Sequence, residues 1–269
     1  MPQDASLPEC LLMGMRLSRV DYEGLLDHVF AALGRARGGW IITANLDFLR
    51  RYTLDVAARS LYDQADVRVV DGMPLVWALA LQGQAPPGRV AGSSLTWRIC
   101  ERAARERRSV YLLGGEPAAN ERAAEVLAAT YPGLVVAGRS SPMFSLPPTA
   151  TELAPVIAEL ERLAPDVLLV GLGSPKQEHL IAALRALLPA TWMVGVGISF
   201  SFVAGHVRRA PPWLRVLGLE WVHRLAQEPR RLARRYLVHD LPFAVRLFAS
   251  AAEHRLRGGQ RAGGSEAQP

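Results

Sequence analysis

The stretch PDVLLVGLGSPKQEHLIAALRALLPATWMVGVGISFSFVAGHVRRAPPW, residues 165–213, decides the fold class of this chain. It begins with an apolar run at 166–170, which is too short for a helix and is bounded by glycine. Gly171 and Gly173 follow this run, and glycine lets the backbone turn tightly where a strand ends. The pattern therefore predicts a buried strand followed by a tight turn.

A helix and a second strand are predicted to follow this turn. Ser174 is a suitable N-cap residue, and the helical apolar periodicity continues to about residue 188. A second apolar run, at 192–196, again ends in a Gly-x-Gly pattern, formed by Gly195 and Gly197. Two strands joined by a helix form a βαβ unit, in which both turns lie at the same edge of a parallel sheet. Ligands of open α/β sheets bind at that edge, so we expect the functional site there.

The residues before this stretch alternate in the same way between short apolar runs and helical patterns. Further strands are predicted at 40–43, 66–70, 110–113 and 134–137. Repeated units of this kind indicate an α/β fold with a mostly parallel, Rossmann-like sheet and helices on both faces. We expect this core to occupy residues 1–207, followed by a basic helical C-terminal appendage at 208–257 and a disordered tail at 258–269.

The positive charge of the chain is concentrated in the C-terminal appendage. The formal net charge is +6, whereas residues 208–257 alone carry eleven arginines against four acidic residues. A helix with a cationic face and an apolar face is suited to lie in the interface of an anionic membrane. The alternative is a helix that packs on the core and leaves its arginines in solvent. The arginines predicted to contact the membrane or an acceptor are Arg208, Arg209, Arg215, Arg224, Arg230, Arg231, Arg234 and Arg235. The apolar residues predicted for the opposite face are Leu225, Leu232, Tyr236, Phe243 and Leu247.

Composition and segment lengths limit where the protein is expected to act. The two cysteines, Cys10 and Cys100, have neither the spacing of a metal site nor that of a disulfide framework, which favours a reducing cytoplasm. The first dozen residues lack the charged-then-apolar pattern of a secretion signal. The longest apolar stretch, 192–205, is too short to cross a bilayer. We expect a cytoplasmic protein that associates peripherally with the inner face of the cell membrane. The sequence allows a homo-oligomer but does not determine the oligomeric state.

Polar residues that end the predicted strands are the candidates for chemistry. Asp71 follows a β-branched strand and could act as a general base that deprotonates a hydroxyl nucleophile, or it could cap the next helix. Thr43 and Asn45 end a neighbouring strand and could hydrogen-bond a ligand, or serve as ordinary caps. Arg89 follows a proline-glycine loop and could contact phosphate groups in a bidentate manner, or be a solvated loop arginine.

The turn after the quoted strand carries a further candidate cluster, Ser174, Lys176, Gln177 and Glu178. Lys176 is the only lysine in a chain that otherwise uses arginine for every basic residue. An ammonium group beside the free backbone N–H groups of Gly171 and Gly173 would form an anion site. The alternative is that one lysine persists on an exposed first helical turn by chance.

Several motifs that would indicate other chemistry are absent from the sequence. No G-x-x-x-x-G-K-[ST] pattern is present, which disfavours a P-loop nucleotidase. The third glycine of the dinucleotide fingerprint is missing after Gly173, and there is no G-x-S-x-G nucleophile elbow. No cluster of histidine and carboxylate residues suggests a metal site, so the charge of a bound diphosphate would be balanced by arginine, lysine and backbone amides.

Taken together, these motifs closely resemble the WecG/TagA/CpsF glycosyltransferase family over roughly residues 13–236. The motifs that carry the resemblance are Thr43-Ala44-Asn45, Ala65-Asp66 followed by Asp71-Gly72, Arg89 with Gly92-Ser93, Tyr111-Leu112-Leu113-Gly114-Gly115, Gly171-x-Gly173-x-Pro175-Lys176-Gln177-Glu178, and Gly195-Val196-Gly197 with Arg209-Ala210-Pro211.

The resemblance implies transfer of a hexose or N-acetylhexosamine-type sugar from a UDP-sugar to a polyprenyl-diphosphate-linked acceptor in cell-surface polysaccharide synthesis. It implies an inverting reaction that needs no metal ion. It also implies that no cofactor takes part, because the UDP-sugar is a co-substrate. By the same resemblance Asp71 is the base, and Thr43, Asn45, Arg89 and Gln177 line the pocket.

Two other classes of function remain as alternatives. A nucleotide-cofactor oxidoreductase would use the same parallel sheet, although the incomplete glycine fingerprint disfavours it. A nucleic-acid-binding protein would use the arginine-rich appendage. The aromatic and aliphatic residues interleaved with those arginines suit a lipid boundary better, so we expect no nucleic-acid partner.

Overall fold

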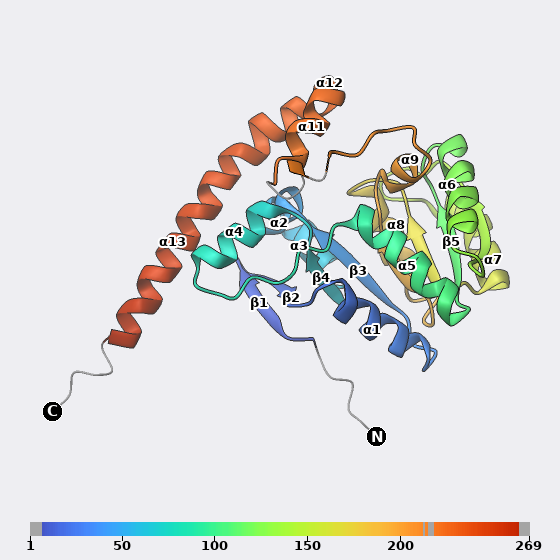
Figure 1. Cartoon of the computed structure of the whole chain (residues 1–269), viewed down its shortest axis with the longest axis horizontal. Coiled ribbons are helices and arrows are strands. Elements are labelled where there is room, and N and C mark those ends of the chain that lie inside the picture. Colours follow the sequence, from blue (N-terminus) through green and yellow to red (C-terminus); the bar gives the residue numbers. More distant parts are fainter. Residues whose placement is uncertain (1–6, 212, 215–217, 264–269) are drawn as a thin grey trace.

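The computed structural model describes residues 7–211, 213–214 and 218–263. Its centre is a parallel six-stranded sheet in the order β4-β3-β8-β7-β5-β6, beside a separate antiparallel hairpin of β1 and β2 (Figure 1). The strands are β1 Glu9–Leu12, β2 Met15–Ser18, β3 Gly39–Ala44, β4 Val67–Val70, β5 Ser109–Leu113, β6 Val135–Ser140, β7 Val167–Val170 and β8 Trp192–Gly195. The predicted α/β fold class is confirmed, including the βαβ unit formed by β7, α8 and β8.

Helices cover both faces of the sheet because the central strands are apolar on both sides. Strands β4, β7 and β8 are buried at every position, as expected of parallel strands between two helical layers. The helices of the core are α1 Tyr22–Leu33, α2 Leu46–Leu54, α3 Val56–Tyr62, α4 Met73–Leu81, α5 Gly92–Glu106, α6 Pro117–Thr130, α7 Ala150–Leu163, α8 Lys176–Leu184 and α9 Ser199–Val203. Helices α1, α5 and α6 contribute to one core cluster, and α2, α4, α7 and α8 contribute to the cluster on the opposite face.

Helix α8 begins one residue later than the sequence predicts. Its N-cap residue is Pro175, and Ser174 precedes it. The Ser174 hydroxyl instead accepts a 3.4 Å hydrogen bond from Nη1 of Arg51 on α2. The reason is tertiary: a hydroxyl suited to capping has found a charged partner on the neighbouring helix.

The C-terminal segment is a series of short helices followed by one long helix. These are α11 Glu220–Gln227, α12 Pro229–Ala233, the π-helix η1 Arg234–Asp240 and α13 Leu241–Gly263. Helix α13 packs along α4 and projects beyond the sheet (Figure 1). It continues to Gly263, so the first six residues of the tail predicted to be disordered are helical, and the remainder, 264–269, lies outside the described residues.

Three of the five residues predicted for the apolar membrane face are buried inside the protein, whereas Leu225 and Tyr236 are partly exposed. Leu232, Phe243 and Leu247 are 3%, 4% and 0% exposed. Phe243 and Leu247 belong to the core cluster that also contains Leu75 and Leu79 of α4. The prediction for these three residues is therefore wrong, because a protein surface of matching shape buries them.

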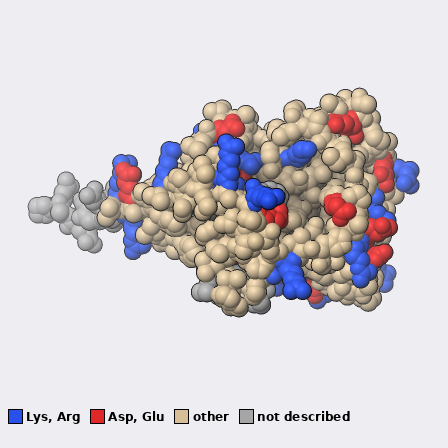
Figure 2. Space-filling view, turned by 90° about the horizontal axis from the view of Figure 1, so that it is seen from above, with Lys and Arg blue, Asp and Glu red and all other residues tan. Residues whose placement is uncertain are grey.

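The arginines of this segment do not form one continuous basic face either. Arg230 and Arg234 are exposed, whereas Arg235 is turned inward and lies within ion-pair distance of Asp47 and Asp240. Figure 2 shows basic and acidic side chains next to one another in the middle of the face that is seen from above. Arg215 lies outside the described residues, and so does the side chain of Arg231. Within the part of the chain that the structure describes, no helix is both long and apolar enough to span a bilayer.

Candidate active site

A cavity of about 490 Å³ lies at the carboxyl ends of β3, β4 and β8. The turns that follow these strands form its floor, and residues of α11, η1 and α13 form its other wall. Of the predicted site residues, it is lined by Thr43, Asn45, Asp71, Arg89, Gly173, Gln177, Gly195, Gly197, Arg224 and Arg235. The ligand edge predicted from parallel strand ends is therefore confirmed as the place of the cavity.

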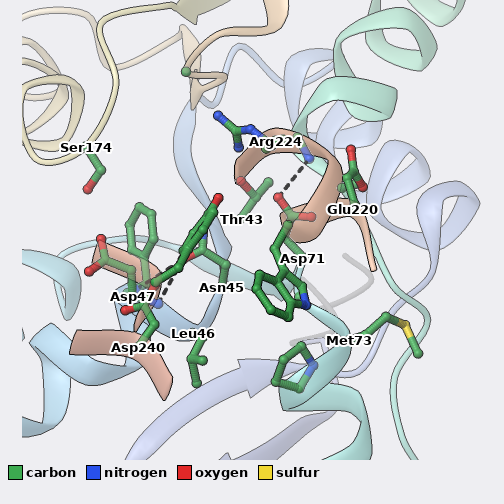
Figure 3. Close-up of a pocket in the computed structure, with 18 of the residues that line it drawn as sticks. Thr43, Asn45, Leu46, Asp47, Asp71, Met73, Ser174, Glu220, Arg224 and Asp240 are labelled. Carbon is green, nitrogen blue, oxygen red and sulfur yellow. Dashed lines mark hydrogen bonds between the residues drawn. The ribbon is translucent and has the colours of Figure 1, made fainter. Parts of the chain in front are cut away.

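Asp71 stands at the centre of this cavity (Figure 3). It directly follows β4, and its backbone N–H donates to the carbonyl of Ala44 at 2.8 Å, which fixes the ends of β4 and β3 side by side. Its side chain is 24% exposed, and Oδ2 accepts a 3.3 Å hydrogen bond from the N–H of Gly92. Helix α4 has Gly72 as its N-cap residue and no side-chain cap, so Asp71 does not cap it.

The pKa of Asp71 is raised from 3.8 to about 6, chiefly because burial disfavours the charged carboxylate. The Arg89 guanidinium opposes this rise, and the Glu220 carboxylate adds to it. A carboxylate with a pKa near 6 is still mostly ionised at pH 7 and is more basic than an ordinary aspartate. Asp71 therefore has the properties of a general base.

Thr43 and Asn45 lie beside Asp71 at the end of β3 (Figure 3). Thr43 is 8% exposed. Asn45 caps α2, because its Oδ1 accepts hydrogen bonds from the N–H groups of Asp47 and Phe48 at 3.1 and 3.3 Å. The alternative that Asn45 is a helix cap is thus correct. Asn45 also lies on the cavity wall, where its Nδ2 amide group can donate a hydrogen bond to a ligand.

Arg89 is an integral part of the site and not a solvated loop arginine. Its Nε donates to the main-chain carbonyl of Asp71 at 2.6 Å. Its Nη2 donates to Oε2 of Glu220 at 2.7 Å and lies 3.8 Å from Oδ1 of Asp71. A guanidinium in this position carries positive charge to the edge of the cavity next to the candidate base.

Gln177 is held by two hydrogen bonds that fix the orientation of its amide. Its Oε1 accepts from the N–H of Gly197 at 3.0 Å, and its Nε2 donates to Oε1 of Glu178 at 2.7 Å. Glu178 is 2% exposed, and burial raises its pKa. A Cβ atom at Gly195 would lie 2.5 Å from Nε2 of Gln177, so this close approach requires glycine.

The structure does not bring Gly171 or Lys176 to the cavity wall. A Cβ atom at Gly171 would lie 2.6 Å from the ring of Phe200, so this glycine serves close packing beneath the turn. The ammonium of Lys176 donates to the carbonyl of Phe144 at 3.0 Å, in the loop between β6 and α7. The predicted anion site around the single lysine is therefore not formed in this structure.

The predicted arginines of the C-terminal segment divide into three groups. Arg224 and Arg235 line the cavity. Arg209 donates to Oγ of Ser94 at 2.9 Å and pairs with Glu220 at 3.5 Å. Those that neither line the cavity nor form a described side-chain ion pair are Arg208, Arg230 and Arg234.

Sequence reasoning missed Glu220, Asp47 and Asp240, three carboxylates on the cavity wall (Figure 3). Glu220 appeared only as one of few acidic residues in a basic segment, which was the available signal. Asp47 is 1% exposed and pairs with Arg50 and Arg51, three and four residues later on α2. That spacing is a helix-pair signal, but it does not reveal that Arg235 completes the network.

The carboxylates do not form a metal centre in the described part of the chain, where no group of three or more His, Cys, Asp or Glu side chains is suitably placed. Each of Asp47, Glu220 and Asp240 faces guanidinium groups instead. The pKa of Asp240 is raised by burial and by the neighbouring charge of Asp47. The site is therefore a cavity of alternating carboxylates and guanidiniums around Asp71.

In a comparison with known protein families, residues 10–257 match the model described as "Glycosyl transferase WecG/TagA/CpsF family". The matched range covers nearly all of the 269 residues, and it includes the helices that form the C-terminal wall of the cavity. It supports sugar transfer over the oxidoreductase and nucleic-acid-binding alternatives.

Proposed function

This chain belongs to the WecG/TagA/CpsF family of glycosyltransferases, and on that premise we propose that it transfers a hexose or N-acetylhexosamine-type sugar from a UDP-sugar to a polyprenyl-diphosphate-linked acceptor. The family makes the protein a sugar-transferring enzyme of cell-envelope polysaccharide synthesis. The identity of donor and acceptor, an inverting course and independence from metal ions are parts of the proposal.

The observation that carries the mechanism is the position of Asp71 in the cavity. The Asp71 carboxylate, with a pKa of about 6 and partly buried at the strand ends, is suited to take a proton from an acceptor hydroxyl. The hydroxyl oxygen then attacks the anomeric carbon as the bond from that carbon to the UDP oxygen breaks. Attack by one group on the face opposite the leaving group inverts the anomeric configuration.

The departing UDP gains negative charge, which cationic side chains in the cavity would stabilise. Arg89 and Arg224 line the cavity, and no ion pair of Arg224 is found among the described residues. These two arginines replace Lys176 in the role that the sequence suggested for the lysine. Gln177 and Asn45, whose amides are fixed by their own hydrogen bonds, would orient sugar hydroxyl groups.

Association with the cytoplasmic face of a membrane is also part of the proposal, through a different surface from the one the sequence predicted. Leu237, Val238, Leu241 and Val245 are 49%, 59%, 55% and 67% exposed and lie close together in sequence over η1 and the start of α13. Exposed arginines flank them, among them Arg234. Apolar side chains beside arginines suit the interface of an anionic bilayer, where the lipid-linked acceptor would be found.

Transfer is tested by measuring UDP release from a panel of UDP-sugars in the presence of a polyprenyl-diphosphate-sugar analogue. Wild-type protein should release UDP from at least one donor, and Asp71→Asn should lower turnover by about 100-fold or more while the variant stays folded. EDTA should leave the rate unchanged. A folded Asp71→Asn variant with wild-type turnover would contradict the role of the base, and loss of activity in EDTA that Mg²⁺ restores would contradict metal independence.

Membrane association is tested by sedimentation with anionic vesicles. Val238→Glu and Val245→Glu should each reduce the sedimented fraction, because both place a negative charge in the exposed apolar surface. Val135→Glu is the matched control, since Val135 is 49% exposed on β6, and β6 pairs with β5, which lies far from α13 (Figure 1). Equal sedimentation of all three variants with the wild type would contradict this surface.

A further inference from the structure

Three charged side chains meet at the cavity wall, where Nη2 of Arg89 lies within 4 Å of two carboxylates, those of Asp71 and Glu220. Nη2 of Arg89 lies 2.7 Å from Oε2 of Glu220 but 3.8 Å from Oδ1 of Asp71. The first distance is that of a charge-assisted hydrogen bond, and the second is too long for one. The guanidinium is therefore committed to Glu220, although Asp71 is within reach.

We propose that Glu220 is a positioning residue whose carboxylate holds the Arg89 guanidinium off the Asp71 carboxylate and so preserves the basicity of Asp71. This inference rests on the proposed function for the role of Asp71 as base. The geometric relation among the three side chains is independent of that role, and it can be measured without any substrate.

The anchoring of Arg89 makes the competition between the two carboxylates direct. Its Nε donates to the main-chain carbonyl of Asp71 at 2.6 Å, and this hydrogen bond would keep the guanidinium next to Asp71 when Glu220 is replaced. Of the two carboxylates that pair with the Nη groups within the described residues, only Asp71 would then remain. A shift of about 1 Å would bring Nη2 to hydrogen-bond distance of Oδ1 of Asp71. A direct partner of opposite charge lowers the pKa of a carboxyl group by about 1–3 units.

Glu220 is itself held by contacts that reach from the C-terminal segment to the core. Nε of Arg209 lies 3.5 Å from Oε1 of Glu220, while Nη1 of Arg209 donates to Oγ of Ser94 on α5 at 2.9 Å. Salt bridges with both arginines lower the pKa of Glu220, so it stays ionised when Asp71 titrates. Because Glu220 is the first residue of α11, the seating of α11 against the core places the charge that tunes the base.

The groups that act on Asp71 come from each element around it. Arg89 is on the loop before α5, Glu220 is on α11, Arg209 is on the loop before α11, and the N–H of Gly92 is at the start of α5. Burial raises the pKa of Asp71, Arg89 and Arg209 lower it, and Glu220 raises it. Removing Glu220 takes away a charge that raises this pKa and frees a charge that lowers it, so both effects have the same sign.

The test measures the pKa of Asp71 directly, by following the ¹³Cγ resonances of protein labelled at aspartate between pH 4 and 9. The resonance of Asp71 is assigned from its absence in Asp71→Asn. The resonance of Asp71 should titrate near pH 6 in the wild-type protein. In the Glu220→Gln variant, the pKa of Asp71 should be lower by about one unit or more. The acid limb of the pH profile of kcat/KM should move to lower pH by the same amount.

A double-variant comparison separates displacement of Arg89 from the simple loss of a nearby charge. Arg89→Gln alone should raise the pKa of Asp71, because its opposing charge is removed. Adding Glu220→Gln to Arg89→Gln should lower that pKa by less than half of the shift that Glu220→Gln causes in the wild type. Glu253→Gln is the control: it removes the same charge from the C-terminal segment at an exposed pair with Arg257, and it should leave the titration unchanged.

An unchanged pKa of Asp71 in Glu220→Gln would overturn the inference, and so would an equal shift in the presence and absence of Arg89. If Glu220→Gln fails to fold, Glu220→Asp takes its place, and its shorter carboxylate should release Arg89 in part and lower the pKa of Asp71. A shifted pKa in a protein that transfers no sugar would leave this inference standing and refute the proposed function. Sugar transfer with an unshifted pKa would do the reverse.

Discussion

The raised pKa of Asp71 has a consequence for stability that can be measured without any substrate. Asp71 titrates near pH 6 in the folded protein, against an ordinary value of 3.8. Between these two values the folded state binds more protons than the unfolded state, so stability falls as the pH rises. The stabilising effect of protonated Asp71 is fully present below about pH 4 and is lost as the pH rises through 6. Replacing Asp71 by the permanently neutral asparagine removes this loss.

The size of the effect follows from the two pKa values. One pKa unit corresponds to about 1.4 kcal/mol, so a difference of roughly two units amounts to about 3 kcal/mol. The Asp71→Asn variant should therefore gain up to about 3 kcal/mol relative to the wild type between pH 4 and pH 7. A change in the hydrogen bond from the N–H of Gly92 that does not depend on pH would add a constant to the difference in unfolding free energy. It would therefore leave the pH dependence of that difference unchanged.

The assay is urea unfolding of wild type and Asp71→Asn at pH 4, 5, 6, 7 and 8. We expect the difference in the free energy of unfolding to rise between pH 4 and 7 and then level off. Asp27→Asn is the control, since the Asp27 side chain on α1 is 68% exposed and loses little hydration on folding. A difference for Asp71→Asn that stays constant over this range would show that burial does not raise the pKa of Asp71, and the reasoning on its basicity would fail.

Three further outcomes are expected from substitutions around the cavity. Gly195→Ala should displace the side chain of Gln177, lowering stability by about 1–3 kcal/mol in urea unfolding and reducing kcat/KM, whereas retention of both values would show that the turn can adjust. Lys176→Met should cost about 1 kcal/mol of stability, through the lost hydrogen bond to Phe144, and should change stability more than kcat. A large fall in kcat with unchanged stability would instead place the lysine in the reaction. Asp47→Asn should destabilise the protein by about 2 kcal/mol, because it removes the ion pair of Arg51 and leaves Arg50 and Arg235 with Asp240 alone, and an unchanged unfolding midpoint would contradict the importance of that network.

Sequence patterning was least informative about whether the C-terminal appendage packs against the core or against a membrane. Helical periodicity identified an apolar face containing Phe243 and Leu247, but the same pattern fits a membrane surface and a protein surface equally well. The structure decided the question, since α4 offers an apolar face that buries both residues. The exposed apolar residues over η1, Leu237 and Val238, come from a π-helical turn whose geometry a regular 3.6-residue period does not predict.

The sequence by itself determined the fold class, the edge of the sheet that carries the cavity and the position of Asp71 in it. Short apolar runs that end in glycine and alternate with helices indicate buried parallel strands, and parallel strands present their carboxyl ends at one edge. Local patterns were sufficient for these features because each depends on a few neighbouring residues and on a topology with one common handedness.

Only the tertiary structure decided which charged groups meet. Glu220 contacts Arg89 across 131 residues of sequence, and Arg235 reaches Asp47 from the other end of the chain. Lys176, which composition singled out, turns to the carbonyl of a loop instead. The physical reason is that the partner of a side chain depends on how separate elements pack and on which charges are desolvated together, and neither is encoded in the spacing of residues along one segment.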